Sequence, residues 1–378
     1  MANLFQNTSL VARDAAIELH GAITTAGLMS GRHEQAFAQK VGDFVDVKVR
    51  PIMSANRHTG SGAFTVSDIS EGKVRLQIKH RVYVKHVLTA QEMAFNVDDF
   101  ATQVTRPAML ALAKDVDSFL IDQLAAGFAR NLVGTDGTDP STIDHLVAAY
   151  VKLFDNESPT DNLGGILTST ALGSFLKLPQ FTNRDYGDEK TAGLRNALLS
   201  QLYGMNFYPN QRAGSHDRGD IAGTVLVKGA SQTGTSIIVD GFTAATGTVK
   251  KGTRLTFAGD TTIYTVAADA TIAANTATLV LTSAKTVAAA DDAAVTFKTA
   301  LRQNVVFHPD AAAKAIIAPM PQRGNPSSVG VFEGLSVRTT FESSISDSST
   351  GDSEAVLYDA FVAGEVIVPE CGVVMQGS

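Results

Sequence analysis

Apolar residues at helical spacing open the chain. Asn7 or Thr8 can cap this first helix. Its apolar residues are Leu10, Val11, Ile17 and Leu19. Three glycines then interrupt the spacing: Gly21, Gly27 and Gly31. The pattern predicts a short helical arm, and not a separate domain, at the start of the chain.

Alternation of apolar and polar residues predicts two strands further along, at 43–52 and at 73–88. The polar face of the second strand is basic and consists of Lys73, Arg75, Lys79, Arg81 and Lys85. Gly, Ser, Thr and Asn are frequent in residues 54–72, which predicts a loop. At about 3.3 Å per residue the second strand would be about 50 Å long. We therefore expect a long two-stranded arm, and it needs a surface to lie on because an isolated hairpin is marginal in water.

Helical spacing returns at Thr105, which can cap a long helix that has Pro107 in its first turn and ends near Leu132. Asp139 and Pro140 predict the start of another helix, as a cap followed by a first-turn proline. Its apolar stripe is Ile143, Leu146, Val147, Tyr150, Val151 and Phe154.

Short strands and helices alternate in the rest of the chain. Strands are expected at 163–169, 205–210 and 304–308, and helices at 170–178, 191–203 and 309–317. Further strands, at 334–344 and within 354–376, flank an acidic, Ser-rich loop at 343–353. Interleaved helices and strands predict an α+β fold in which the C-terminal part returns to the sheet begun by the early strands.

Residues 221–300 have a different character, because they are rich in Thr, Ala and Gly and contain no Glu, His or Cys. Six strand candidates occur there: 224–228, 236–240, 254–258, 262–266, 277–282 and 294–298. Turns containing Gly or Asp separate most of them, which is typical of a small all-β sandwich or barrel. The helix and strand pattern resumes afterwards, so we expect this β module to be inserted within another domain.

Composition, net charge and cysteine count narrow the range of functions that the protein could have. A chain of 378 residues with 44% hydrophobic and 18% charged residues is an ordered protein of two or three domains. Its net charge of −7 argues against tight binding to nucleic acid. Cys371 alone cannot form an intramolecular disulfide or a multi-cysteine metal cluster. The sequence has no long apolar run or signal peptide, so we expect a soluble protein made in the cytoplasm.

No motif predicts a catalytic residue, a metal site or a cofactor. His80 and His86 share one face of a predicted strand but are about 20 Å apart, too far to bind one metal. GTDGTDP at 134–140 lacks the spaced ligands of a calcium loop, so we interpret it as a turn with a helix cap. The acidic loop containing Asp347 and Asp352 could bind a divalent cation, but a solvated loop is the simpler interpretation.

The order of these elements resembles that of a known protein family. Three stretches of sequence support the resemblance: MANLFQNTSLVARDA, FHPDAAAKAII, and GLSVRTTF followed by VPECGVVM. Nearly the whole chain resembles the coat-protein fold shared by tailed bacteriophages and the herpesvirus capsid floor. That fold has an N-terminal arm, an extended hairpin loop, a peripheral domain with a long spine helix, and an axial α/β domain. The corresponding residues are 1–40, 41–90, 91–139 with 325–378, and 140–220 with 301–324. Residues 221–300 are similar to the insertion domain of one subfamily.

The resemblance implies a major capsid protein, in the virion, that assembles in the host bacterial cytoplasm. Copies of the chain would form hexamers and pentamers and then an icosahedral shell around double-stranded DNA. It implies scaffolding and portal proteins as partners, allows a decoration protein, and implies only non-specific contact with packaged DNA. The alternative is another phage structural protein, a tail or decoration component with the β module for adhesion, and an enzyme is a distant third.

Within that resemblance, we expect the basic residues of the extended loop to contact a neighbouring subunit: Arg57, Lys73, Arg75, Lys79, Arg81 and Lys85. The alternatives are contact with packaged DNA and a solvated strand face. Glycines that could act as hinges between different subunit environments are Gly21, Gly27, Gly31, Gly60 and Gly62, although each could be an ordinary turn residue.

Some tailed-phage shells are locked by isopeptide bonds from a lysine of the extended loop to an asparagine of a neighbour. Residues 51–72 contain no lysine, and the guanidinium of Arg57 cannot make this bond. We therefore expect shells without covalent cross-links. The sequence begins almost directly with the arm, so we also expect a separate scaffolding protein.

Overall fold

The computed structural model describes residues 8–34, 37, 43–49, 55, 57–58, 71–89, 100–178, 202–321, 325–344 and 353–377. Its internal contacts divide the chain into two compact units. Unit 1 comprises Met1–His20, Ser30–Leu112 and Ala313–Val368. Unit 2 comprises Gly21–Met29, Ala113–Ala312 and Pro369–Ser378. Each unit is therefore assembled from three segments that are far apart in the sequence.

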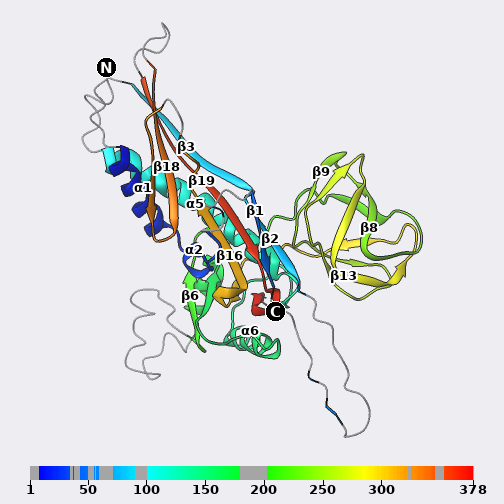
Figure 1. The fold of residues 1–378 in the computed structure, drawn as a ribbon. Coiled ribbons are helices and arrows are strands. Elements are labelled where there is room, and N and C mark those ends of the chain that lie inside the picture. The colour runs from blue at the N-terminus through cyan, green and yellow to red at the C-terminus, as the bar shows by residue number, and fades with distance from the viewer. Residues whose placement is uncertain are drawn as a thin grey trace. The chain divides into compact units, whose positions relative to one another are not determined.

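Unit 1 is organised around one sheet with the strand order β16-β19-β18-β17. A further strand, β3, pairs antiparallel with β19, and Figure 1 shows β3, β19 and β18 side by side. The strands are β3 (His80–Thr89), β16 (Ala312–Ile317), β17 (Ser327–Phe332), β18 (Leu335–Ser344) and β19 (Ser353–Val366). Alternate residues of β19, such as Val356 and Tyr358, are fully buried, so one face of this sheet forms the core of the unit.

Helix α1 (Thr8–Ala22) confirms the predicted N-terminal helix, but a different face of it is buried. The predicted apolar residues Leu10 and Ile17 are exposed. The buried residues are small except for one leucine: Ala12, Ala15, Ala16 and Leu19. Small residues allow close packing, and a Cβ atom added to Gly330 of β17 would overlap the carbonyl oxygen of Ala12. Backbone proximity, and not a large apolar stripe, therefore attaches α1 to the sheet.

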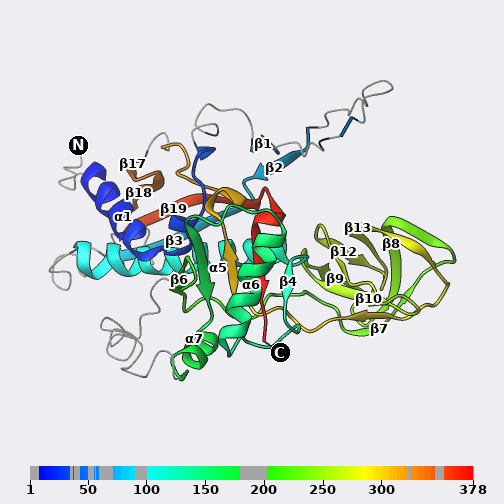
Figure 2. The same ribbon diagram turned by 90° about the horizontal axis from the view of Figure 1, so that it is seen from below.

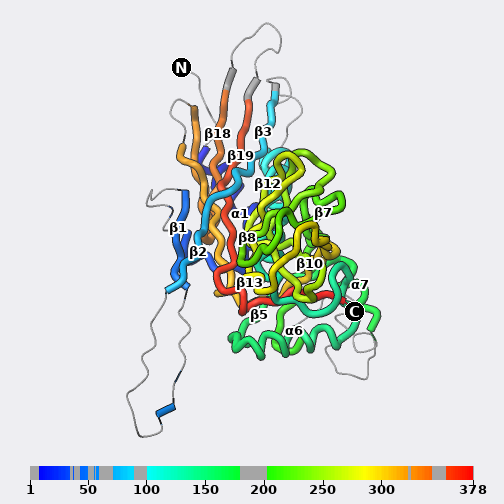
Figure 3. The backbone as a smooth tube through the Cα atoms, turned by 90° about the vertical axis from the view of Figure 1, so that its right-hand side faces the viewer, coloured from blue at the N-terminus to red at the C-terminus, as the bar shows by residue number. Residues whose placement is uncertain are grey.

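The predicted strand at 73–88 is two strands with different partners. Strand β2 (Lys73–Gln77) pairs with β1 (Phe44–Lys48), whereas β3 pairs with β19 (Figure 3). The hairpin β1–β2 therefore has five residue pairs, and the prediction of one long two-stranded arm is wrong for the described residues. Val47 and Leu76 of this hairpin belong to a core cluster with residues of β16 and β19, which supplies the surface that the short hairpin needs.

A long helix, α5 (Arg106–Phe128), follows a π-helical segment at Ala101–Thr105 and confirms the predicted spine helix. The hydroxyl of Thr105 does not begin the helix as a cap, because it forms a hydrogen bond of 2.8 Å with the hydroxyl of Tyr358. The helix ends earlier than predicted, since Leu132–Val133 form strand β4 and pair with β20.

Unit 2 contains a second five-stranded sheet in the order β4-β20-β15-β5-β6. Besides β4, its strands are β5 (Leu163–Leu167), β6 (Met205–Pro209), β15 (Val305–Phe307) and β20 (Gly372–Met375). Helices α6 (Ile143–Asp155) and α7 (Ser169–Phe175) share a core with one face of this sheet (Figure 2). The ring of Phe128 from α5 stacks on that of Phe307 from β15, at 5.8 Å between centroids. A short helix, α2 (Thr25–Leu28), also belongs to unit 2. We call this sheet and its helices the α/β body of unit 2.

Two predicted helices need correction. The predicted helix at 309–317 is a single 3-10 turn (Pro309–Ala311) followed by strand β16, in which five of the six residues are buried. Burial on both faces of the strand overrides the helix propensity of its alanines. Helix α6 begins at Ile143 with Thr142 as its cap, because Asp139 bonds elsewhere, as described below. The predicted helix at 191–203 falls almost wholly outside the described residues, as does the loop at 343–353.

The β module, residues 221–300, contains eight strands. They are β7 (Gly223–Val227), β8 (Gln232–Phe242), β9 (Thr246–Val249), β10 (Arg254–Phe257), β11 (Tyr264–Thr265), β12 (Ala270–Ala273), β13 (Ala277–Ala289) and β14 (Val295–Phe297). All six predicted segments contain a strand, while β9 and β12 were not predicted. They form the sheets β13-β8-β7, β11-β10-β14 and β12-β9, around an apolar core drawn from this module alone.

Strand pairing cuts across the predicted domain boundaries. Strand β16 pairs within the sheet of β19, and β20 pairs with β15. The predicted division instead groups 301–324 with 140–220 and 325–378 with 91–139. The five-part division remains a prediction, and the sheet partners indicate where its borders would move.

Candidate functional site

The basic residues of the predicted contact face lie on β2, on β3 and in the short connection between them. On the β1–β2 hairpin, Lys73 and Arg75 both bind the carboxylate of Asp46, at 3.1 and 2.9 Å. Hydrogen bonds from Arg75 and then Lys73 hold the pKa of Asp46 below its usual value. The guanidinium of Arg75 also lies 3.9 Å from the centre of the Phe44 ring. Both cations therefore share one carboxylate partner within their own chain.

The remaining basic residues bind acids across the sheet of unit 1. Lys79 pairs with Glu365 at 3.2 Å, and Lys85 pairs with Glu342 at 2.9 Å. Arg81 pairs with Asp359. Arg57 is exposed, and the loop around it lies largely outside the described residues. The role of these residues in contacts between subunits remains a prediction, and any such contact would have to share or displace these internal partners.

Asp359 is the centre of a buried charged cluster that the sequence pattern did not reveal. Its carboxylate is fully buried and accepts hydrogen bonds from Nε and a terminal nitrogen of Arg338, at 2.9 and 2.6 Å. The other terminal nitrogen of Arg338 donates to the carbonyl oxygen of Met320 at 2.7 Å. The two residues are directly opposite each other on β18 and β19. Because the donors of the guanidinium and the acceptors of the carboxylate match, the pair can exist in the interior.

The predicted hinge glycines differ in their surroundings. Gly27 lies within α2, and neither Gly21 nor Gly27 has an atom within 4 Å of the position where a Cβ would stand. Gly31 packs against the carboxylate of Glu34, at 3.3 Å from the same position. Gly60 and Gly62 lie outside the described residues. A side chain would therefore fit at the first two positions, both of which lie in helices, and hinge function remains a prediction.

Glu34 occupies an unusual environment that the sequence analysis missed. Its Oε1 atom is buried without a hydrogen-bond partner, and Gly31 and Gly334 pack against its carboxyl group. Burial raises its pKa to about 7, while the charge of Lys314 and the backbone N–H of Ile316 act in the opposite direction. Burial also lowers the pKa of Lys314. This carboxyl group can therefore change its protonation state near neutral pH.

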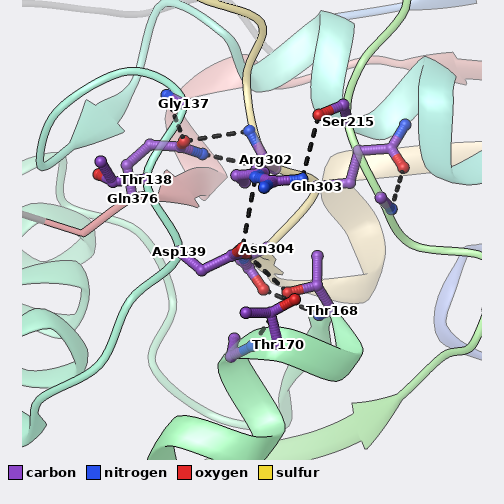
Figure 4. A network of polar contacts seen from close by, with 12 residues as sticks. Gly137, Thr138, Asp139, Thr168, Thr170, Ser215, Arg302, Gln303, Asn304 and Gln376 are labelled. Carbon is purple, nitrogen blue, oxygen red and sulfur yellow. Dashed lines mark hydrogen bonds and ion pairs between the residues drawn. The ribbon is translucent and has the colours of Figure 1, made fainter.

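A polar network joins the segments that meet where the β module leaves the α/β body of unit 2 (Figure 4). Asp139 is its centre and accepts hydrogen bonds from Thr168 Oγ1 at 2.7 Å and from Asn304 Nδ2 at 3.0 Å. Arg302 Nε lies 3.3 Å from the other carboxylate oxygen of Asp139. The amide of Gln376 binds the backbone N–H and C=O of Arg302 and the N–H of Gly137. Asp139 thus holds distant segments together, which explains why it does not cap α6.

The two connections to the β module also bind each other. The N–H of His216 donates to the carbonyl of Leu301 at 2.8 Å, and the N–H of Gln303 donates to that of Gly214 at 2.9 Å. Arg254 of the module pairs with Asp136. These contacts bring the entry and the exit of the module together and attach it to the loop at 134–139.

The β module also contains a polar groove. A groove of about 910 Å³ in the β module is bordered by Arg218 and Asp220. Both residues already bind backbone groups, those of Lys298 and Thr248. In the described part of the chain, no group of three or more His, Cys, Asp or Glu side chains could hold a metal ion. Nor does any described helix combine the length and apolar character needed to cross a membrane.

No model of a known protein family matches the sequence, and no curated protein is similar to it. Solved structures do match. A structure of Mycobacterium phage Che8 is 15% identical with a TM-score of 0.54, and the match covers 94% of this chain and 92% of that one. The capsid structure of the cyanophage P-SCSP1u is 11% identical with a TM-score of 0.48, covering 89% and 84%. The match with the first of these, over nearly the whole of both chains, shows that this chain shares the fold of the Che8 structure.

Proposed function

We propose that the chain is the major capsid protein of a tailed bacteriophage and that its copies enclose the double-stranded DNA genome. The observation that carries the proposal is the fold likeness, which covers 94% of this chain and 92% of its structural neighbour. The proposed shell contains hexamers and pentamers, and scaffolding and portal proteins assist its assembly in the host cytoplasm.

The charge of the molecule supports a container more than a DNA-binding protein. The net charge is −7, and the basic residues of β2 and β3 are paired with acids of the same chain. Phosphate groups would have to share or displace these internal partners, so we expect contact with packaged DNA to be weak and non-specific. The polar clusters of the described residues connect distant segments of the chain, which suits a structural protein and not an enzyme.

The assembly test is direct. Recombinant protein, expressed with and without the scaffolding protein of the same phage, is separated by sedimentation and viewed by negative-stain electron microscopy. The proposal predicts fast-sedimenting closed shells. Rods or tubes would instead favour a tail component, and a monomer that binds preformed shells would favour a decoration component.

The absence of lysine from residues 51–72 supports a shell without covalent cross-links. Mature particles boiled in denaturing buffer should give one subunit band on a gel. Ladders of subunit multiples would contradict this part of the proposal while leaving the capsid function intact.

A further inference from the structure

Helix α6 has apolar residues on its solvent side. Val147, Val151 and Phe154 are 38%, 48% and 66% exposed, while Leu146 and Leu153 are buried on the opposite side. The three exposed residues are spaced i, i+4 and i+7, so they form one continuous stripe along the helix. The sequence pattern placed these three residues in one apolar stripe with Leu146, and the structure buries only part of that stripe. A continuous exposed apolar stripe that ends in a phenylalanine indicates a surface covered by another molecule.

The charges beside this stripe restrict what can cover it. Asp144 and Asp155 are both exposed, one near each end of α6, whereas Lys152 of the same helix is only half-exposed. If α6 packed antiparallel against α6 of a second copy, Asp144 of one would face Asp155 of the other, and the like charges would repel. A parallel arrangement would place each aspartate beside the same aspartate of the other copy, and these like charges would also repel. The covering surface therefore has to be a different one, with exposed apolar groups and positive charge.

Unit 2 carries such a surface at β6. Tyr203 and Tyr208 are 53% and 42% exposed, and Arg212, just beyond the strand, is exposed as well. Lys177 adds a second exposed cation after α7. Tyrosine and arginine are the residue types enriched in protein interfaces, because they combine apolar area with polar ends. The exposed side chains at β6 are thus aromatic and cationic, whereas the α6 stripe is apolar and has an aspartate near each end.

The two surfaces belong to opposite ends of one sheet. Strand β6 is the last strand of the order β4-β20-β15-β5-β6, whereas α6 packs against β20 and β4 at the other end (Figure 2). A contact between two different surfaces of one subunit is head-to-tail, and repeating it closes a ring when the rotation between subunits permits.

We infer that the exposed stripe of α6 docks onto the β6 surface of a second copy of this chain and that this contact closes the subunit ring. The stripe is Val147, Val151 and Phe154 with Asp144 and Asp155, and the β6 surface is Tyr203, Tyr208, Arg212 and Lys177. The inference rests on the proposed capsid function and identifies one interface within its hexamers and pentamers.

A charge exchange tests the contact. Asp155→Arg and Arg212→Glu should each lower the yield of closed shells about tenfold, as expected for like charges across an interface. The double variant should recover most of the wild-type yield, because the attraction is restored with its direction reversed. Asp161→Arg is the matched control, since Asp161 is 85% exposed in the same unit but belongs to neither surface. Circular dichroism and thermal melting of the unassembled proteins verify their folding.

A cysteine pair provides a second readout if a charge variant does not fold. In a Cys371→Ser background, Val151→Cys with Tyr208→Cys should give subunit ladders after oxidation of assembled particles, and either cysteine alone should give none. Suppose that wild-type protein forms closed shells, that the single charge variants assemble as well as Asp161→Arg, and that the cysteine pair gives no ladder. The inferred contact is then overturned, and the capsid function stands. If wild-type protein forms no shells at all, the capsid function itself is overturned.

Discussion

Among single residues, Glu34 combines burial, a missing hydrogen bond at Oε1 and a nearby lysine. The charged groups around it come from two elements: Lys314 lies on β16, and Arg32 and His33 precede Glu34 in its own segment. Glu333, beside Gly334, is paired with His20 at 3.1 Å. The raised pKa of Glu34 therefore reflects desolvation that Lys314 only partly offsets.

Glu34→Gln should remove a pH dependence of stability. The unfolded chain releases the Glu34 proton near the ordinary pKa of 4.5 and the folded chain near 7, so the folded state binds more protons between these values. The free energy of unfolding of the wild type then decreases as pH rises from about 4.5 to 7. We expect Glu34→Gln to melt on the order of 2–4 °C above wild type at pH 8 and equally at pH 4.

Thermal melting across this pH range is the measurement, and Glu157→Gln, at an exposed position, is its control. A Glu34→Gln profile parallel to that of the wild type would show that the carboxyl group is ionised freely in the folded protein.

Asp359 makes unequal contacts with its two arginines, and this difference can be measured. Asp359→Ala leaves the buried Arg338 without its partner and should lower the free energy of unfolding by about 3–5 kcal/mol. Arg81→Ala removes a side chain that is 45% exposed and should cost about 1 kcal/mol or less, since Arg338 still neutralises Asp359. Calorimetric melting compares the two variants. Equal losses of unfolding free energy in the two variants would mean that Arg81, and not Arg338, compensates the buried charge of Asp359.

At the scale of elements, Gly330 tests how α1 is attached to β17. A methyl group at this position would overlap the carbonyl oxygen of Ala12, a backbone atom that cannot rotate away. Gly330→Ala should therefore loosen α1 and increase the rate of proteolysis within residues 8–22. Gly173→Ala is the control, because Gly173 lies in α7 with no atom within 4 Å of the added group. Unchanged proteolysis in Gly330→Ala would exclude close backbone packing at this point.

Several elements could be predicted from the sequence because their signals are local. Alternation located the strands at 44–48 and 73–77 and six strands of the β module, and helical spacing located α1 and α5. Residues 309–317 were predicted wrongly because their alanines favour a helix while the sheet around β19 buries both of their faces. Local pattern also could not reveal the break between β2 and β3, since only their different partners separate them.

The candidate sites depended on contacts between distant residues and were therefore largely missed. The basic residues of 73–85 were found, but their acidic partners Asp359, Glu365 and Glu342 lie more than 250 residues away in sequence. Asp139 was interpreted as a helix cap because its partners Thr168 and Asn304 lie far from it in the sequence, and a local pattern does not show them. The apolar spacing of α6 was recognised, but spacing alone does not show which side faces the core.

For the whole molecule, the connections of the β module predict that it can be removed. Its entry and exit are hydrogen-bonded to each other at Gly214 and Gln303, so a short linker can join them. The module also has its own core, separate from that of the α/β sheet. Deletion of residues 222–300 should leave a soluble protein with a cooperative thermal transition. Loss of that transition would mean that the module stabilises the rest of unit 2.

The central claim is that copies of this chain form an icosahedral shell. Electron cryomicroscopy of purified particles tests it most directly, because a reconstruction identifies both the lattice and the chain that builds it. We predict a closed shell whose repeating density fits the two units of this chain in rings of six and rings of five. A reconstruction in which this chain forms a helical tube, or binds the outside of a shell built by another protein, would contradict the account.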